Sequence, residues 1–352
     1  MRIIRYILIL AAACVFSAVP FATSAQTADD RATITADNSQ HTRMRLRRPD
    51  YLHAGDTVAV LSTSGRISER SDTARVRNVL ESWGLRVMFG KYYADRSQPY
   101  FAGCDSVRAA DLQHAIDNPN IKAIIAYRGG YGAVRLLPEV DFSPIFVHPK
   151  WIVGFSDITL LHLLMNGAGI ESIHGPMPET FSFDDEGNAD ESVESLRAAL
   201  FGELRQIDIE PHPLNRTGHA EGVLAGGNLM ILSSAAGTPE AMRTDGPTIL
   251  FIEEIGEAAY RIDRMMQQLL RSGALANVTA IVAGHFTGTT HMDKFGVESA
   301  YEIIDEYARR LGIPAMYGFP AGHELPNTAI YLGRQVAVDI TDNGATLTFA
   351  NN

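Results

Sequence analysis

Cysteine is almost missing from this chain of 352 residues, which contains only Cys14 and Cys104. If Cys14 leaves with a cleaved N-terminal segment, no disulfide can form within the mature chain. Low-complexity tracts and repeats at solenoid spacing are also absent. The folded part must therefore be stabilised by its own hydrophobic cores, and an apolar share of 46% is sufficient for two modest domains.

An excess of positive charge and metal-binding motifs are absent as well. The chain has 30 Lys and Arg residues against 41 Asp and Glu residues, which gives a formal net charge of -11. Because phosphates are bound by clustered Lys and Arg, this charge argues against nucleic acid as a partner. No His-Glu-x-x-His motif and no Cys/His cluster occurs, so we expect no metal and no other cofactor.

An apolar run stands near the N-terminus. It spans residues 6–19, follows Arg2 and Arg5, and precedes small residues at 23–25. This order is typical of a secretory signal peptide that is cleaved after Ala25. The run is too short and too interrupted to span a bilayer comfortably. We therefore expect an exported protein, periplasmic or secreted, without stable membrane insertion.

A lipoprotein anchored through Cys14 is the alternative interpretation of this segment. The residues after Cys14 stay apolar, and Ala11 stands where a leucine is more usual. Both observations favour ordinary cleavage and a soluble exported product.

The rest of the chain divides into four segments. Residues 26–46 are polar and without periodicity, which predicts a flexible leader. Residues 47–181 alternate short apolar strands with helices, which predicts an N-terminal α/β domain with a parallel sheet. The acidic segment 182–194 is expected to be a linker to a C-terminal domain, residues 195–352. Strands are expected at 57–61, 85–89, 121–127, 151–154, 248–252, 278–283, 335–340 and 345–349, and helices at 68–83, 105–116, 157–166, 226–236, 260–272 and 297–311.

A sharp turn, Phe155-Ser156-Asp157, follows the strand at 151–154. A serine on such a turn projects its hydroxyl at the carboxyl end of the sheet, where open α/β sheets bind ligands. The helix that follows offers free N–H groups, which suit an oxyanion. Alternatively, Ser156 or Asp157 simply caps this helix. The G-x-S-x-G pattern of hydrolases is not met, because Ile158 stands at the second glycine, so the pattern alone favours the cap.

The loop Arg128-Gly-Gly-Tyr-Gly132 follows directly on the strand at 121–127. Its glycines allow backbone N–H groups to approach a ligand closely. The loop is either a plain strand-to-helix turn or a donor of hydrogen bonds to an oxyanion beside Ser156. The residues alone favour neither of these two roles. A phosphate site is not supported, since neither G-x-G-x-x-G nor Gly-Lys-Ser/Thr occurs.

Carboxylates and histidines supply the remaining candidates for chemistry. Three acids follow the strand at 248–252 within five positions: Glu253, Glu254 and Glu257. Such a group suits the orientation of a base or the binding of a cation. Alternatively, these acids are only solvated, as acids at strand ends often are. Three histidines lie in glycine-bearing turns, and any of them could be the base: His174, His285 and His323.

An ordered set of motifs resembles the LD-carboxypeptidase family of serine peptidases, from about residue 49 to 340. Each motif is weak by itself, whereas the ordered set is specific. The motifs are Gly55-Asp56 with Ser62-Thr-Ser-Gly65, Arg128–Gly132, Gly154–Thr159, His174–Met177, Gly226–Leu229 with Gly237–Pro239, Phe251–Glu253 with Tyr260–Arg264, and Gly322-His323 with Leu332-Gly333.

The resemblance implies an N-terminal three-layer α/β domain and a C-terminal β-rich α/β domain, with the active site between them. It also implies a triad of Ser156 as nucleophile, His323 as base and Glu253 as its partner. In this mechanism we expect the backbone N–H groups of Asp157 and Gly130 to bind the oxyanion. Arg128 is the candidate cation that binds the terminal carboxylate of the substrate. Because neighbouring residues of a strand face opposite ways, only one of Glu253 and Glu254 should face His323.

The resemblance further implies release of a C-terminal D-Ala from an L,D bond of peptidoglycan tetrapeptides, in cell-wall recycling or remodelling. Family members commonly pair, so a homodimer is expected. The related microcin-immunity peptidases share the triad but act in the cytoplasm, so the export signal argues against that alternative. A non-catalytic muropeptide-binding protein is disfavoured because all three triad residues are present. The glycine loop alone does not support a sugar- or nucleotide-binding protein.

Overall fold

The computed structural model describes residues 46–184 and 187–350. The predicted signal peptide with Cys14, and the leader up to residue 45, lie outside these residues. None of the described helices is long and apolar enough to cross a membrane.

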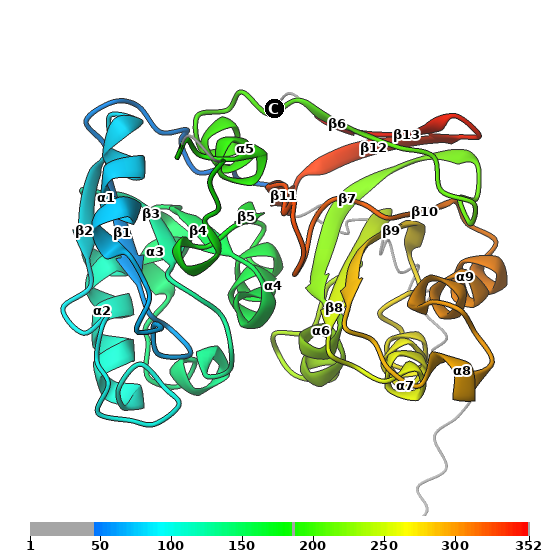
Figure 1. Ribbon diagram of the computed structural model, residues 1–352, viewed down its shortest axis with the longest axis horizontal. Coiled ribbons are helices and arrows are strands. Elements are labelled where there is room, and N and C mark those ends of the chain that lie inside the picture. The colour runs from blue at the N-terminus through cyan, green and yellow to red at the C-terminus, as the bar shows by residue number, and fades with distance from the viewer. Residues whose placement is uncertain (1–45, 185–186, 351–352) are drawn as a thin grey trace, which may run out of the picture. The chain divides into compact units, whose positions relative to one another are not determined.

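The N-terminal part is built on a six-stranded sheet with the strand order β11-β5-β4-β3-β1-β2 (Figure 1). Strands β1 to β5 run parallel, which confirms the α/β class. Their central members are apolar along most of their length because helices cover both faces of the sheet. The elements are β1 (Thr57–Leu61), α1 (Thr73–Ser82), β2 (Arg86–Phe89), α2 (Asp105–Asp117), β3 (Ile121–Ala126), η1 (Ala133–Leu136), α3 (Ser143–Val147), β4 (Trp151–Gly154), η2 (Ser156–Ile158), α4 (Thr159–Gly167), β5 (Ser172–His174) and η3 (Pro178–Thr180).

The C-terminal part is built on a mixed seven-stranded sheet with the strand order β10-β9-β8-β7-β12-β13-β6. Strands β7 to β10 run parallel, whereas β12, β13 and β6 are joined antiparallel. The elements are α5 (Glu191–Leu200), β6 (Gln206–Ile209), β7 (Gly218–Asn228), α6 (Leu229–Ala235), β8 (Thr248–Ile255), α7 (Ala259–Arg271), β9 (Val278–Thr287), α8 (Met292–Phe295), α9 (Ala300–Leu311), β10 (Ala315–Tyr317), β11 (Ile330–Leu332), β12 (Gln335–Thr341) and β13 (Gly344–Phe349).

Alternate residues of the strands pack against different helices. In the six-stranded sheet, Leu61 and Ile124 belong to a buried cluster with residues of α2 and α4. Val60 and Ile125 belong to another cluster, together with residues of α1 and α5. That second cluster continues into the seven-stranded sheet, so one hydrophobic core joins the two sheets.

The predicted helix at 226–236 is wrong in its first part. The strand β7 continues to Asn228, and α6 begins only at Leu229. Gly226 and Gly227, at the start of that predicted helix, lie inside the strand: a Cβ built on Gly226 would lie 1.8 Å from the carbonyl oxygen of Phe251. Gly226 is therefore required by the close approach of β7 to β8, which a single sequence does not reveal.

The predicted linker at 182–194 needs correction, because α5 begins inside it at Glu191. Asp190 caps this helix by accepting a hydrogen bond from Val193 N at 3.1 Å. Two of the acidic residues that suggested a linker, Glu191 and Glu194, lie in the first helical turn, where the helix dipole favours negative charge.

The strand β11 was missed, and it changes the domain boundary. Ile330 to Leu332 pair antiparallel with His174 to Ser172 of β5. The six-stranded sheet therefore includes a strand from the part assigned to the C-terminal domain. A buried strand of three residues has no periodicity, so sequence reasoning could not assign it to either sheet.

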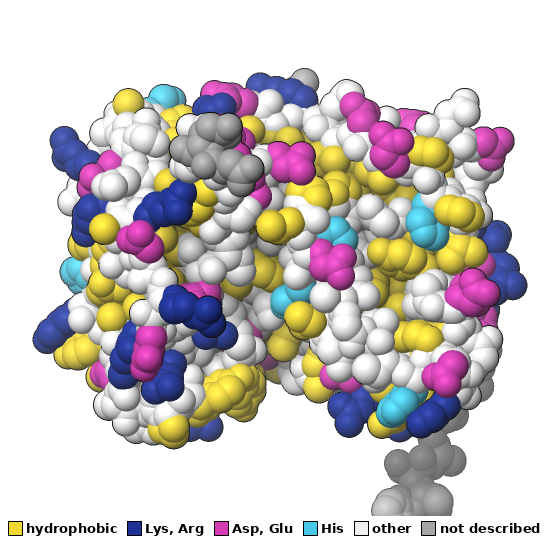
Figure 2. Space-filling view, in the orientation of Figure 1, with side chains coloured by type: hydrophobic (Ala, Val, Ile, Leu, Met, Phe, Trp, Pro, Cys, Tyr) yellow, Lys and Arg dark blue, Asp and Glu magenta, His cyan; other side chains and the backbone are white. Residues whose placement is uncertain are grey.

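Charged side chains of both signs are interspersed on the face shown in Figure 2. This face therefore has no continuous field of one sign, and ligand recognition there depends on individual groups.

Candidate active site

Ser156 stands on a strained turn at the carboxyl end of β4. Its φ of 62° lies in the left-handed region, which residues other than glycine rarely adopt. Such strain is held only by surrounding structure and is common at functional sites. No side-chain cap starts α4, whose first residue is Thr159. The cap interpretation of Ser156 and Asp157 is therefore wrong, and the serine hydroxyl is free for another role.

The carboxylate of Asp157 anchors the loops around this turn. It accepts hydrogen bonds from Ser64 Oγ at 2.6 Å and from Ala133 N at 2.8 Å. Burial raises the pKa of Asp157, although these two donors act in the opposite direction. Asp157 therefore fixes the serine turn with its side chain and can offer only its backbone N–H to a ligand.

The glycine loop passes directly over Ser156. A Cβ built on Gly129 would lie 3.0 Å from Ser156 Cβ and 3.3 Å from Ser156 Oγ. Gly129 accepts a hydrogen bond on its carbonyl from Gly65 N at 3.2 Å. Gly130 is exposed, with φ 111°. The loop thus belongs to the serine site, and the contact through Gly129 was missed because the sequence did not separate a plain turn from an oxyanion loop.

Arg128 precedes these glycines and is half-buried. Its Nη1 donates a hydrogen bond to the carbonyl of Arg66 at 3.0 Å. The guanidinium also lies close to Gly65, since a Cβ built there would be 3.4 Å from Arg128 Nε. A positive charge is therefore held beside the loop that covers Ser156.

Glu253 and His323 form a pair in which the carboxylate is fully buried and the imidazole partly exposed. His323 Nδ1 lies 2.6 Å from Glu253 Oε2, and the exposed fractions of the two side chains are 13% and 0%. Gly322 makes this contact possible, because a Cβ at that position would lie 3.2 Å from Glu253 Oε2. The pair has the geometry in which a carboxylate fixes the tautomer and orientation of an imidazole.

Phe155 connects this pair to the serine turn. Its ring packs edge-on against the His323 ring with 4.8 Å between centroids. Ser156 is the next residue, so the structure brings the serine turn and the His323–Glu253 pair into one site. Between the described atoms of Ser156 and His323 there is no direct hydrogen bond. Catalytic hydrogen bonds are often long or poorly aligned without a bound substrate, so this absence does not exclude His323 as the base.

Glu254 faces away from His323. Its carboxylate accepts hydrogen bonds from Asn228 Nδ2 at 3.1 Å, Met230 N at 2.7 Å and Ile255 N at 2.9 Å. Burial raises the pKa of Glu254 to about 7. Glu254 is thus a buried acceptor that joins β8 to the start of α6, and the view that both acids are solvated is wrong. Glu257 pairs instead with Arg261, at 3.3 Å.

The two other candidate bases have different surroundings. His174 is fully buried, neither ring nitrogen has a hydrogen-bond partner among the described residues, and burial lowers its pKa. His285 Nδ1 accepts a hydrogen bond from Glu324 N at 3.3 Å, and burial lowers the pKa of this histidine too. Of the three candidates, only His323 has a carboxylate on its ring. Within residues 46–184 and 187–350, no group of three or more His, Cys, Asp or Glu side chains could hold a metal ion.

Comparison with known proteins gives matches along most of the chain. Residues 58–175 match the LD-carboxypeptidase N-terminal domain, and residues 221–338 match the LD-carboxypeptidase C-terminal domain. A probable murein peptide carboxypeptidase of Bacillus subtilis is 36% identical over 310 residues, which cover 85% of this chain and 94% of the relative.

A solved structure and a more distant relative extend this comparison. The crystal structure of muramoyltetrapeptide carboxypeptidase from Oxalobacter formigenes is similar with a TM-score of 0.74 and 30% identity, covering 84% of this chain and 99% of that one. The microcin C7 self-immunity protein MccF of Escherichia coli is 26% identical over 331 residues, covering 84% of this chain and 94% of MccF.

Proposed function

Because the chain belongs to the LD-carboxypeptidase family and is a serine-type carboxypeptidase, we propose that it releases a C-terminal D-Ala from an L,D bond of peptidoglycan tetrapeptides. The observation that carries the proposal is the His323–Glu253 pair, with 2.6 Å between Nδ1 and Oε2, beside the strained Ser156 turn. A positioned base next to a serine is the arrangement of nucleophilic acyl transfer.

Ser156 Oγ attacks the carbonyl carbon of the scissile amide while His323 takes the hydroxyl proton. His323 then gives this proton to the leaving amine, so that D-Ala departs and an ester to Ser156 remains. Water, deprotonated by the same imidazole, hydrolyses the ester and frees the shortened peptide. Glu253 holds the imidazole in position and stabilises its charged form throughout.

The oxyanion is held by the backbone N–H groups of Asp157 and Gly130. The carbonyl and the N–H of one trans peptide point in opposite directions. Since the Gly129 carbonyl faces Gly65, the N–H of Gly130 points away from Gly65. Loss of one such donor typically raises the barrier by about 3 kcal/mol.

Arg128 supplies the positive charge that a carboxypeptidase needs for the terminal carboxylate of its substrate. It is held at the edge of the glycine loop by its bond to the Arg66 carbonyl. Arginine suits this role because its planar guanidinium matches a carboxylate in two parallel hydrogen bonds.

Export is part of the proposal. The order of charge, apolar run and small residues at 1–25 favours a soluble periplasmic or secreted enzyme over a lipoprotein anchored through Cys14. A homodimer stays a prediction from the family resemblance.

A microcin-immunity-like amidase is the second candidate, and the relationship to MccF supports it at 26% identity. The murein peptide carboxypeptidase is closer, at 36% identity, and favours the peptidoglycan substrate. A non-catalytic muropeptide binder would need neither the Glu253–His323 contact nor a strained serine.

Incubation of the purified protein with a cell-wall tetrapeptide that ends in D-Ala tests the function. We expect mass spectrometry to show the loss of one alanine, with full activity in excess chelator because the proposed chemistry uses no metal. The Ser156→Ala variant is the control and should be inactive. An intact tetrapeptide after incubation with the parent protein would reject the proposal, as would activity that chelator abolishes and zinc restores.

A further inference from the structure

We propose that Ser192 and Ser195 of α5 are positioning residues for His323 and act through the segment 322–332, called the strap here. This inference rests on the proposed function, because it concerns the base of that reaction. Neither serine touches the reacting groups directly, and no sequence motif singles them out.

The strap connects the two sheets of the molecule. It follows β10, a strand of the seven-stranded sheet, and it ends with β11, a strand of the six-stranded sheet. Glu253 lies on β8 of the seven-stranded sheet, whereas Ser156 follows β4 of the six-stranded sheet. His323 must meet both groups, so its place depends on how the strap is held between the sheets.

Hydrogen bonds hold the strap at three successive places. Asn327 Oδ1 accepts from Gly322 N at 3.0 Å, which closes the loop that contains His323. Asn327 N donates to Ser192 Oγ at 3.0 Å, and Ala329 N donates to Ser195 Oγ at 2.8 Å. The closed loop is thus fixed to α5 by two serine hydroxyls spaced one helical turn apart.

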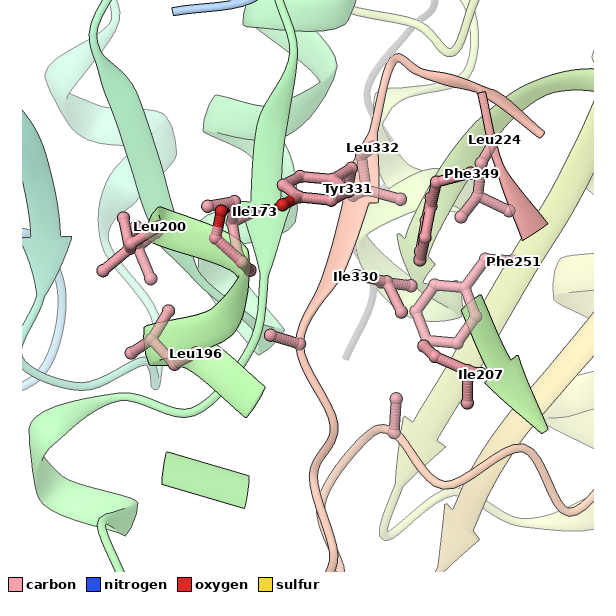
Figure 3. Packing of buried hydrophobic residues seen from close by; sticks show 14 of the residues in the cluster. Ile173, Leu196, Leu200, Ile207, Leu224, Phe251, Ile330, Tyr331, Leu332 and Phe349 are labelled. Carbon is pink, nitrogen blue, oxygen red and sulfur yellow. Dashed lines mark hydrogen bonds between the residues drawn. The ribbon is translucent and has the colours of Figure 1, made fainter. Parts of the chain in front are cut away.

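The surroundings of these bonds make them hard to replace. Ser192 is 0% exposed and Asn327 is 3% exposed, so water cannot readily take the place of a lost acceptor. Tyr331, at the end of the strap, donates its hydroxyl to the Ala199 carbonyl at 2.7 Å. Figure 3 shows Ile330, Tyr331 and Leu332 between Leu196 and Leu200 of α5 on one side and Leu224 and Phe251 on the other. The apolar packing keeps the strap close to α5, and the two serines set its register.

A register error in the strap would affect turnover more than binding. Catalytic groups must meet at near-attack distances, and a misplacement of about 1 Å can lower the rate by about 100-fold. Removal of one serine hydroxyl leaves a backbone N–H without an acceptor, and the strap relaxes to find another. His323 then moves relative to Glu253 and Ser156, while Arg128 and the glycine loop, which face the substrate, keep their places.

The kinetic test compares Ser192→Ala, Ser195→Ala and the double variant with Ser234→Ala. Ser234 is a matched control, because its hydroxyl bonds the carbonyl three residues earlier at 3.1 Å, as that of Ser195 does at 2.6 Å. We expect kcat for D-Ala release to fall about 10- to 100-fold in the α5 variants, with KM within about twofold of the parent. Ser195→Thr keeps the hydroxyl and should restore kcat, whereas Ser234→Ala should match the parent.

A proton NMR spectrum supplies a readout that does not depend on substrate. The proton between His323 Nδ1 and Glu253 Oε2 should give a low-field signal in the parent and in Ser234→Ala. We expect the signal to broaden or vanish in the α5 double variant while its thermal unfolding stays cooperative. An unchanged signal and unchanged kcat in that variant would overturn the inference. If the parent shows the signal but releases no D-Ala, the proposed function fails and the spectra still decide the role of the serines.

Discussion

At the residue scale, the two neighbouring acids at the end of β8 have separate tasks. Glu253 contacts His323, and Glu254 contacts Asn228 and the backbone at the start of α6. Strand alternation predicts that the two side chains point apart. The choice of the acid that faces the histidine came from the family resemblance, since alternation alone does not say which face is which.

The Glu253→Gln variant should lose turnover but keep its fold. Glutamine has nearly the same shape, but it cannot stabilise a charged imidazole or enforce its tautomer. By analogy with other catalytic triads, we expect kcat to fall by about 10⁴-fold with little change in KM or in the melting temperature. Steady-state kinetics and thermal melts check this. A fully active variant would show that the carboxylate of the site is elsewhere.

The Glu254→Gln variant should lose stability rather than turnover. A glutamine cannot accept from all three donors, so we expect about 1–3 kcal/mol less free energy of unfolding near pH 5. The folded pKa of Glu254 is about 7, above the ordinary value of 4.5. Between these values only the folded state holds the proton, so the parent loses stability as pH rises through this window. The difference in free energy of unfolding between parent and variant should therefore narrow from pH 5 to pH 8; this difference is called the gap below.

Urea unfolding of both proteins at a series of pH values measures this gap. Glu257→Gln is the control, because Glu257 forms only a partly exposed pair with Arg261. A gap that stays constant from pH 5 to pH 8 would mean that Glu254 is ionised in the folded chain across the whole range.

At the scale of single elements, glycine spacing was the least reliable signal. Gly226 and Gly227 stand at the start of the predicted helix at 226–236, yet they lie in β7. A Cβ on Gly226 would meet the backbone of β8, and a Cβ on Gly227 would meet the side chain of Thr159. The glycines of the loop at 128–132, in contrast, do form a loop beside Ser156. A single sequence does not distinguish the two uses, because both depend on which backbone lies opposite.

The Gly226→Ala variant should destabilise the protein strongly. Its Cβ would lie 1.8 Å from the Phe251 carbonyl oxygen, at a φ of 142°. The strands would have to separate, so we expect a loss of about 3 kcal/mol or more. Gly237→Ala is the matched control: Gly237 also has a positive φ, but nothing lies within 4 Å of its Cβ position, and a loss of about 1 kcal/mol is expected. Equal midpoints in urea for the two variants would contradict the packing argument.

At the scale of the whole molecule, the two parts share one core and one buried ion pair. Arg334, just after β11, donates from Nε to Glu171 Oε2 at 2.8 Å, and the two side chains are 2% and 0% exposed. Its guanidinium also stacks on Tyr331. The sequence predicted an α/β fold in two parts, and the family resemblance implied a site between them. It did not predict that β11 and Arg334 join the N-terminal part, because Arg334 and its partner Glu171 are more than 150 positions apart.

The Arg334→Met variant should therefore unfold more readily than a surface variant. It removes Arg334 from a fully buried carboxylate, and breaking a buried ion pair typically costs about 3–5 kcal/mol. Arg197→Met removes a partly exposed pair with Glu194 and Glu203 and should cost about 0–1 kcal/mol. Urea midpoints of both variants test the difference, and similar midpoints would mean that the buried pair adds nothing.

The late position of β11 in the chain has a consequence for biosynthesis. A ribosome delivers the N-terminal part first, so β5 carries an unpaired edge until residue 332 has emerged. Such an edge is a template for aggregation. The segment that seals the edge is the same one that delivers His323 to Glu253. A chain cut short before the strap would thus be inactive and prone to self-association. The capacity to hydrolyse a substrate arises only when β11 has paired with the exposed edge of β5.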